Sequence, residues 1–337
     1  MNYLSLYSER NVFQEAISTA VETLLRGGLI SFPTETVYGL GADACNFNAV
    51  SRVFLVKGRP LGHPLIVHLA GEADVERWSK KVSGVALRII QHFWPGPLTL
   101  ILKRHPKVLD IVTGGQDTVG LRCPAHPAAL ALLQAFGEGI VAPSANRFGR
   151  LSPTCVADVV AELGGAIDSH IDGGACQIGI ESTILDLSGG NPRILRPGAV
   201  TALAIAEVLG EIPKRASASS LRSPGLSPYH YAPLSPLRLV EDDSLENIAL
   251  YYLKKGWGVS VLSKRQPKEN LVGVRWCQMP TAPTSYARRL YAQLRAVDTG
   301  ARQYILVGCP PASSEWEAVI DRLDRASAGS SVREVAL

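Results

Sequence analysis

Cations, histidines and hydroxyl groups recur where apolar stretches of this sequence end. The first cluster, residues 33–40, contains Thr36 and directly follows an apolar stretch. The second cluster, residues 57–68, also has glycines and prolines that favour a fixed loop. Its charged and titratable members are Lys57, Arg59, His63 and His68. Ends of strands are where an α/β sheet places its ligand-binding side chains, so both clusters predict a binding site rather than a solvated surface.

Further clusters follow along the chain, again next to strand-like stretches. They contribute Thr118, Arg122, Ser144, Ser152, Ser182 and Arg196. Each cluster alone has a structural explanation, since a strand-end arginine often pairs with a surface carboxylate and a Ser-Pro-Thr run often caps a helix. Together, cations interleaved with hydroxyl groups are what a polyanion such as a nucleoside triphosphate requires.

Several common catalytic motifs are missing from the sequence. It has no Gly-Lys dipeptide and hence no P-loop, no His-Glu-x-x-His and no Gly-x-Ser-x-Gly. Residues 39–44 match a loose dinucleotide-binding fingerprint, but an acidic residue about 20 positions further on is lacking. We therefore interpret these glycines as shaping a turn.

Alternating helical and strand-like patterns must position the clusters up to about residue 210. The expected helices span 13–25, 49–57, 85–94, 127–136 and 154–163, and the expected strands span 29–32, 64–70, 98–102, 118–121 and 140–142. A hairpin is expected between 182–187 and 193–195. Asn48 is the expected cap of the second helix, and Ser152 with Pro153 that of the last. These elements predict a mixed α/β domain over residues 1–210.

Residues 211–236 change character, with five prolines and six serines. This composition is typical of a linker, yet the stretch also carries Tyr231, which a spacer does not need. We expect it to act as a lid over the active site. Beyond it, strands at 238–240, 259–263 and 304–307 alternate with helices at 245–254, 285–297 and 314–325. Residues 237–337 should thus form a smaller Rossmann-like α/β domain with a parallel sheet.

The composition is that of a folded protein without membrane spans. Of the 337 residues, 46% are hydrophobic and 19% charged, and no apolar run reaches the length of a bilayer. The six cysteines follow no zinc-binding pattern, so they are expected to be reduced, and we expect a cytoplasmic location. A net charge of +4 allows an anionic substrate but is too small to indicate a nucleic-acid coat.

In their order, the clusters resemble the threonylcarbamoyl-AMP synthase family, in its long form with a YrdC-like domain and a C-terminal extension. The matching stretches are PTETVYGLG, KGRP, HPLIVH, WPGPLTLIL, TVGLRCP, APSAN, LSPT, ESTILDL, ILRPGAV and HYAP. They run from about residue 31 to 233, and together they are highly specific. The C-terminal hundred residues carry no quotable motif.

The resemblance implies an enzyme that joins L-threonine, bicarbonate and ATP into threonylcarbamoyl-AMP and pyrophosphate. Its implied partners are transferase proteins that move the threonylcarbamoyl group onto an adenosine of tRNA, with at most weak contact to the tRNA itself. Mg²⁺ is expected to arrive with ATP, held mainly by phosphate and water, and no protein ligand is assigned to it. No membrane association is implied.

The resemblance also assigns residues to the two substrates. Threonine would be held by Thr36, His68, Arg122 and Ser182. ATP would be surrounded by Arg59, His63, Thr118, Ser144, Ser152, Arg196 and Tyr231. Lys57 and Arg59 would carry the catalytic charge at the phosphates. The sequence departs from the family at Phe148, where a serine is usual, and in the linker before the His-Tyr-Ala-Pro motif.

Two other functions compete with this interpretation. The cations could grip RNA directly, although aromatic residues make up only 7% of the chain and no basic tail exists. A related domain serves carbamoyl transfer in hydrogenase maturation, but that class brings zinc-finger cysteines and an acylphosphatase module, which this sequence lacks.

Overall fold

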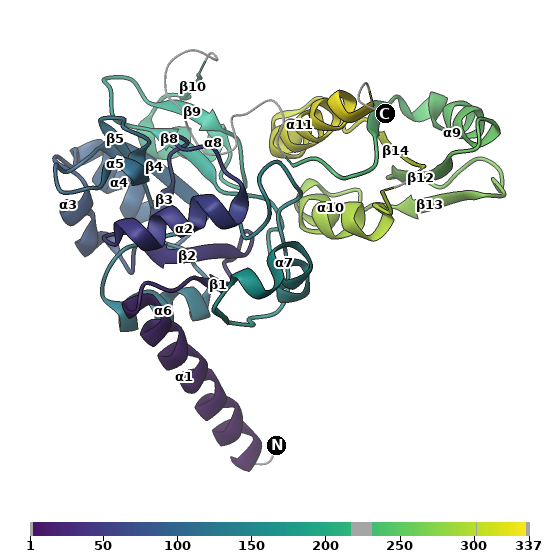
Figure 1. The fold of residues 1–337 in the computed structure, drawn as a ribbon. Coiled ribbons are helices and arrows are strands. Elements are labelled where there is room, and N and C mark those ends of the chain that lie inside the picture. The colour runs from purple at the N-terminus through teal and green to yellow at the C-terminus, as the bar shows by residue number, and fades with distance from the viewer. Residues whose placement is uncertain (1–2, 217–230, 301, 335–337) are drawn as a thin grey trace.

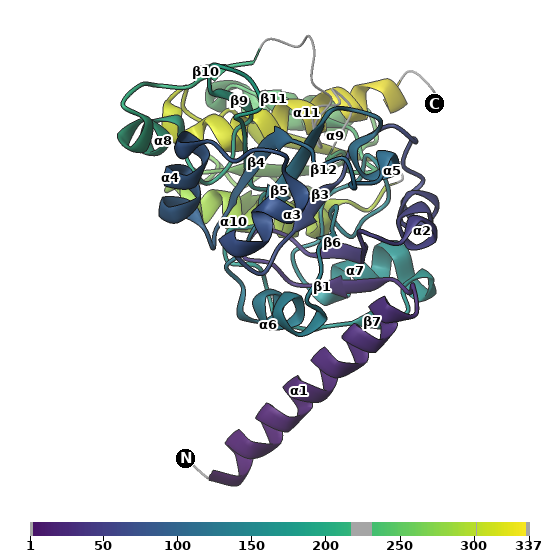
Figure 2. The same ribbon diagram turned by 90° about the vertical axis from the view of Figure 1, so that its left-hand side faces the viewer.

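The computed structural model describes residues 3–216, 231–300 and 302–334. In this part of the chain, the strands form two separate sheets. Figure 1 shows two bodies: the larger sheet with its helices on the left, and the smaller sheet with its helices on the right. Helix α1 projects away from the first of these bodies. Figure 2, turned by 90°, shows the same projection of α1.

The larger sheet is mixed, and its ten strands have the order β10-β9-β8-β4-β5-β3-β6-β2-β1-β7. The strands are β1 (Ile30–Phe32), β2 (Gly39–Asp43), β3 (Ile66–His68), β4 (Leu98–Lys103), β5 (Thr118–Arg122), β6 (Ile140–Val141), β7 (Ser169–His170), β8 (Thr183–Asp186), β9 (Arg193–Arg196) and β10 (Lys214–Arg215). The helices are α1 (Tyr3–Leu25), α2 (Phe47–Lys57), α3 (Val75–Trp78), α4 (Gly84–Phe93), α5 (Asp110–Thr113), α6 (Pro127–Phe136), α7 (Val156–Leu163) and α8 (Ala202–Leu209).

Side chains alternate between the two faces of this sheet, because successive residues of a strand point in opposite directions. On one face, Val67 and Leu121 join a large apolar core with α2 and α4. On the other face, α1 and α6 cover β1 and β6. Further along that second face, Ile66 belongs to a smaller apolar cluster with side chains of β4, β8 and β9.

Glycines at 39 and 41 lie inside strand β2, so the expectation of a turn at 39–44 was wrong. Strand β2 pairs antiparallel with β1, with Ile30 opposite Gly41. A Cβ atom on Gly41 would lie 2.8 Å from Ile30 and 3.0 Å from Phe32. The glycines are therefore needed because neighbouring side chains fill the space above the strand.

Two expected helix caps were also wrong. Helix α2 is capped by Asn46, whose side chain accepts hydrogen bonds from the backbone N–H groups of Asn48 and Ala49 at 3.0 and 3.1 Å. The cap residue of α7 is Cys155, whose side chain makes no capping hydrogen bond. Ser152 instead bonds Glu181, as described below.

The smaller sheet is entirely parallel, as expected for a Rossmann-like fold, and has the strand order β11-β14-β12-β13. Its strands are β11 (Leu237–Val240), β12 (Gly258–Ser263), β13 (Val274–Gln278) and β14 (Gln303–Gly308). Its helices are α9 (Leu245–Lys254), α10 (Pro283–Val297) and α11 (Glu317–Glu334). The sequence pattern missed β13, an edge strand whose side chains are largely half-exposed.

The two sheets lie on either side of helices α10 and α11, which face the first body, while α9 lies on the far side (Figure 1). One apolar cluster crosses this boundary and joins Leu151 and Ile180 to α10 and α11. Strand β10 pairs with β9 of the larger sheet, although it lies in the stretch expected to be a linker. Residues 217–230, most of the expected lid, lie outside the described residues. Within the described part, no helix is both long and apolar enough to cross a bilayer.

Candidate functional site

The second face of the larger sheet brings the sequence clusters together at β3 and β5. Thr118, Gly120 and Arg122 alternate along β5 and so share one face, with Thr118 and Arg122 about 13 Å apart. Strand β3 lies beside β5, and His68 stands opposite Arg122. Gly120 adds no side chain between the two ends of β5. A Cβ atom on Gly120 would lie 3.3 Å from Ile101 and 3.4 Å from Ile66, so apolar side chains fill the space between Thr118 and Arg122.

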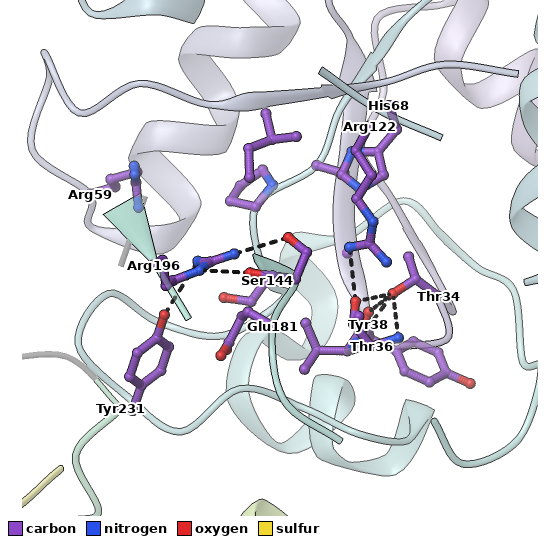
Figure 3. Close-up of a pocket in the computed structure, with 16 residues that line it drawn as sticks. Thr34, Thr36, Tyr38, Arg59, His68, Arg122, Ser144, Glu181, Arg196 and Tyr231 are labelled. Carbon is purple, nitrogen blue, oxygen red and sulfur yellow. Dashed lines mark hydrogen bonds between the residues drawn. The ribbon is translucent and has the colours of Figure 1, made fainter. Parts of the chain in front are cut away.

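A pocket opens over this face, with an empty volume of about 540 Å³ that includes its open mouth. It is lined by Thr34, Thr36, Val37, Tyr38, Gly39, Arg59, Ile66, His68, Arg122, Ala142, Pro143, Ser144, Glu181, Ser182, Arg196 and Tyr231. Figure 3 shows Arg122 with Thr34 and Thr36 on one side of the pocket, and Arg59, Arg196 and Tyr231 on the other.

Arg122 is held rigidly at the first side of the pocket. Its guanidinium donates to Thr36 Oγ1 at 2.9 Å, to Glu35 Oε1 at 2.6 Å and to the Gly96 carbonyl at 3.2 Å. Thr36 in turn is fixed by Thr34, whose hydroxyl lies 2.8 Å from that of Thr36. A guanidinium has five N–H donors, so two remain for a ligand in the pocket.

His68 is buried beside Arg122, and its Nδ1 atom has no hydrogen-bond partner. Burial, and secondarily the charge of Arg122, lower the pKa of His68 to about 3. The imidazole is therefore neutral at physiological pH and acts as a hydrogen-bonding group, not as a cation. A buried unpartnered nitrogen at a pocket wall is the kind of group that a ligand satisfies.

Arg59 and Arg196 provide the positive charge on the other side. Arg59 Nη2 donates to the Pro64 carbonyl at 3.0 Å, while its buried Nε has no partner. Burial lowers the pKa of Arg59 to about 10, which leaves it charged at neutral pH. Arg196 donates to the backbone carbonyl and hydroxyl of Ser182 at 3.0 and 3.1 Å, and it contacts Tyr231 Oη at 3.5 Å.

Eight of the residues expected at the site line this pocket: Thr36, His68, Arg122 and Ser182 from the threonine set, and Arg59, Ser144, Arg196 and Tyr231 from the ATP set. The pocket lining does not include Lys57, His63, Thr118 or Ser152.

One of these four residues, His63, borders the Arg59 side. His63 lies edge-on to the ring of Phe148, with 5.4 Å between ring centroids, and Arg59 lies 5.7 Å from the same ring. Thr118 is buried at the start of β5. Phe148 therefore takes part in the wall behind Arg59.

Lys57 points into the protein at the end of α2. Its ammonium group donates to the backbone carbonyls of Ser144 and Asn146, and burial lowers its pKa well below the usual value. In this position Lys57 fixes the loop that presents Ser144 to the pocket.

Glu181, Thr34 and Tyr38 also line the pocket; they belong to the polar clusters and matching stretches of the sequence but were assigned no role there. Glu181 stands next to Ser182 in the sequence, and that adjacency was the available signal. Thr34 precedes Thr36 by two positions, so both hydroxyl groups can come from one short loop. Glu181 is the only acidic side chain among the described lining residues.

Two family models match the chain. A model described as telomere recombination, of the Sua5, YciO and YrdC proteins, matches residues 22–198. A model described as the threonylcarbamoyl-AMP synthase C-terminal domain matches residues 200–328.

Curated relatives extend the similarity over nearly the whole chain. A threonylcarbamoyl-AMP synthase of Pyrococcus abyssi is 37% identical over 92% of this chain and 94% of its own length. The Bacillus subtilis synthase is 36% identical over 98% of both chains. A crystal structure of P. abyssi Sua5 complexed with L-threonine has a TM-score of 0.85 and 36% identity, covering 93% of this chain and 94% of that one.

Proposed function

This chain belongs to the threonylcarbamoyl-AMP synthase family and is a synthase of that kind, and we propose that it assembles its product from L-threonine, bicarbonate and ATP in the pocket over β3 and β5. The observation that carries this proposal is one pocket with three buried arginines, Arg59, Arg122 and Arg196, and two buried unpartnered nitrogens, Arg59 Nε and His68 Nδ1. Anionic substrates would compensate both features.

The Arg122 side of the pocket suits threonine. The two remaining N–H donors of Arg122 can bind its carboxylate in parallel. His68, which is neutral, and the hydroxyls of Thr36 and Ser182 suit the amine, the hydroxyl or a carbamate. A relative crystallised with L-threonine supports this assignment.

The Arg59 side suits the triphosphate of ATP. Arg59 and Arg196 would face phosphate oxygens, and Ser144 and Tyr231 line the same pocket. His63, Thr118 and Ser152 do not line the pocket and would act on the nucleotide indirectly, Ser152 through its hydrogen bond to Glu181. Lys57 would act through the loop of Ser144, whose carbonyl it binds, so that its charge reaches the phosphates only indirectly.

The reaction follows from holding these anions together. The amine of threonine forms a C–N bond to the carbon of bicarbonate, a C–O bond breaks and water leaves, which gives a carbamate. A carbamate oxygen then attacks the α-phosphorus of ATP, and the bond to the leaving pyrophosphate breaks. The arginines would stabilise the charge that develops on the phosphates, and no nucleophilic side chain is needed.

Mg²⁺ would enter as part of the ATP complex. Glu181 in the pocket lining and Glu35 beside Arg122 are each paired with an arginine, so neither is placed as a metal ligand. The ion would therefore keep phosphate and water ligands, and supply charge neutralisation at the phosphates. The product would pass to separate transferase proteins that modify tRNA.

The test is a set of incubations with ATP, bicarbonate and single amino acids while pyrophosphate is monitored. Release that requires both threonine and bicarbonate is expected. Equal release with serine, or without an amino acid, would overturn the substrate assignment. Salt-sensitive RNA binding without ATP turnover would instead support the RNA-binding alternative.

A further inference from the structure

Glu181 connects the pocket to the C-terminal helices. Its Oε1 accepts a hydrogen bond from Ser152, and its Oε2 accepts from Tyr291 of α10 at 3.0 Å and from Arg322 of α11 at 2.7 Å. The one acidic side chain among the described lining residues is thus held by two groups about 110 and 140 positions away in the sequence.

Arg322 is fully buried, and its guanidinium has other partners besides Glu181. Its Nη2 donates to the carbonyl of Pro197 at 3.0 Å, directly after Arg196, and its Nη1 donates to Asp321 at 2.6 Å. Its guanidinium also lies 5.3 Å from the centre of the Tyr231 ring. One side chain of α11 therefore contacts Glu181, Tyr231 and the end of β9.

The charges around Glu181 explain why the contact with Arg322 is important for binding an anionic ligand. Burial alone would raise the pKa of Glu181. The positive charges of Arg322 and, next in size, Arg196 outweigh burial, and the hydrogen bond from Ser152 acts in the same direction, so that the pKa is lowered. Tyr291 and Tyr231 also face the carboxylate, and burial raises the pKa of both, so both stay uncharged at neutral pH. Without Arg322, the full negative charge of Glu181 would act on Arg196 and on any phosphate near it.

We propose that Arg322 is a positioning residue for the ATP half of the site: it holds Glu181 and offsets its charge, so that the carboxylate does not oppose phosphates bound at Arg196. The proposal rests on the proposed function, since it assumes that a polyanion binds at Arg196. It makes the C-terminal domain a part of the active site, acting through Arg322 and Tyr291.

The test is a double-mutant cycle in the full-length protein, with ATP affinity measured by calorimetry. Arg322→Gln should weaken ATP binding about ten- to a hundredfold, because the unpaired carboxylate opposes the phosphates. In a Glu181→Gln background, the same substitution should cost no more than about threefold, since the opposing charge is gone. Equal losses in both backgrounds would show that Arg322 acts only through packing and would overturn the proposal.

Arg295 of α10 provides a matched control at the same boundary. It donates to Glu162 at 2.9 Å and to the Leu151 carbonyl, and neither residue lines the pocket. Arg295→Gln should change ATP affinity less than about threefold in either background. A loss as large as that of Arg322→Gln would also overturn the proposal.

The pH dependence gives a second readout that packing would not alter. In Arg322→Gln the pKa of Glu181 rises, so the carboxyl takes up a proton as the pH falls and stops opposing the phosphates. The ATP-binding defect should therefore shrink from pH 8 to pH 6, whereas a constant defect counts against the proposal. If Arg322→Gln fails to fold, the same cycle is run with Arg322→Met, which also removes the charge beside Glu181, and the same outcomes are expected. Wild-type protein that binds no ATP would overturn the proposed function itself.

Discussion

Arg122 is the residue from which the chemistry of threonine binding can be tested most directly. Arg122→Lys keeps a charge beside Glu35 but loses the paired N–H donors that suit a carboxylate. We expect threonine affinity to fall about ten- to a hundredfold, which corresponds to about 1.5–3 kcal/mol for a charge-assisted bond in a closed pocket. Calorimetry of threonine binding measures the loss.

Arg77→Ala is the control for this variant. Arg77 lies on the surface, where it pairs with Glu138, and should leave threonine affinity unchanged. A folded Arg122→Lys protein with wild-type threonine affinity would remove Arg122 from the binding site.

His68 should make the stability of the fold depend on pH. Its pKa is about 3 in the folded protein and about 6.5 unfolded, so below pH 6.5 the unfolded chain binds the additional proton. The stability contributed by neutral His68 is complete above pH 6.5 and is lost as the pH falls toward 3. From pH 7 to pH 5 this loss amounts to about 2 kcal/mol.

Denaturant unfolding of wild type and His68→Gln at both pH values checks this expectation. The variant should lose about 2 kcal/mol less than wild type between pH 7 and pH 5. His92→Gln, on the exposed side of α4, is the surface control. Identical pH differences in wild type and His68→Gln would contradict burial of a neutral imidazole.

At the scale of the element, strand β2 depends on having no side chain at Gly41. Gly41→Ala would place a Cβ atom 2.8 Å from Ile30, inside the contact distance of two carbon atoms. We expect a loss of about 1–3 kcal/mol in the free energy of unfolding, because β1 and β2 must separate locally. Denaturant unfolding measures it.

Gly71→Ala is the control for the strand glycine, since a Cβ there meets nothing within 4 Å. If both substitutions cost the same, crowding at β2 is not the reason for Gly41. The loop between β1 and β2 carries Thr34, Thr36 and Tyr38, so Gly41→Ala should also weaken threonine binding.

At the scale of the whole molecule, Gly179 lets the C-terminal helices approach the pocket. Its φ is +82°, and a Cβ atom there would lie 2.6 Å from the backbone of Arg288 in α10. Gly179→Ala should therefore displace α10 and α11, and with them the contacts of Tyr291 and Arg322 to Glu181. We expect at least a tenfold loss of ATP affinity, beyond the loss of stability from the strained backbone.

Gly210→Ala separates these two effects. Gly210 has nearly the same φ, +84°, but open space around its Cβ position. The Gly210→Ala substitution should lower the free energy of unfolding by about 1–2 kcal/mol, because alanine is strained at this backbone conformation. Its ATP affinity should stay at the wild-type value. Equal ATP affinities for both variants would show that the approach of α10 does not control the site.

The sequence by itself determined the elements with strong periodicity and the residue types of the site. Helix α6 and helix α9 have the expected bounds, and α6 is marked by Pro127 in its first turn and Gly137 directly after its last residue. The clusters also predicted an anion-binding site, because arginines interleaved with hydroxyl groups at strand ends are suited to binding a polyanion.

Only the tertiary structure decided which groups meet. Gly41 belongs to a strand because Ile30 and Phe32 pack over it, which no local pattern reveals. Likewise, Lys57 binds carbonyls of a loop about 90 positions away, and Arg322 reaches Glu181 across 141 positions. Local propensity acts over a few residues, whereas burial and charge pairing act between whatever side chains the fold brings within a few ångströms. The roles of Lys57, Glu181 and Arg322 therefore depend on the packing of the fold.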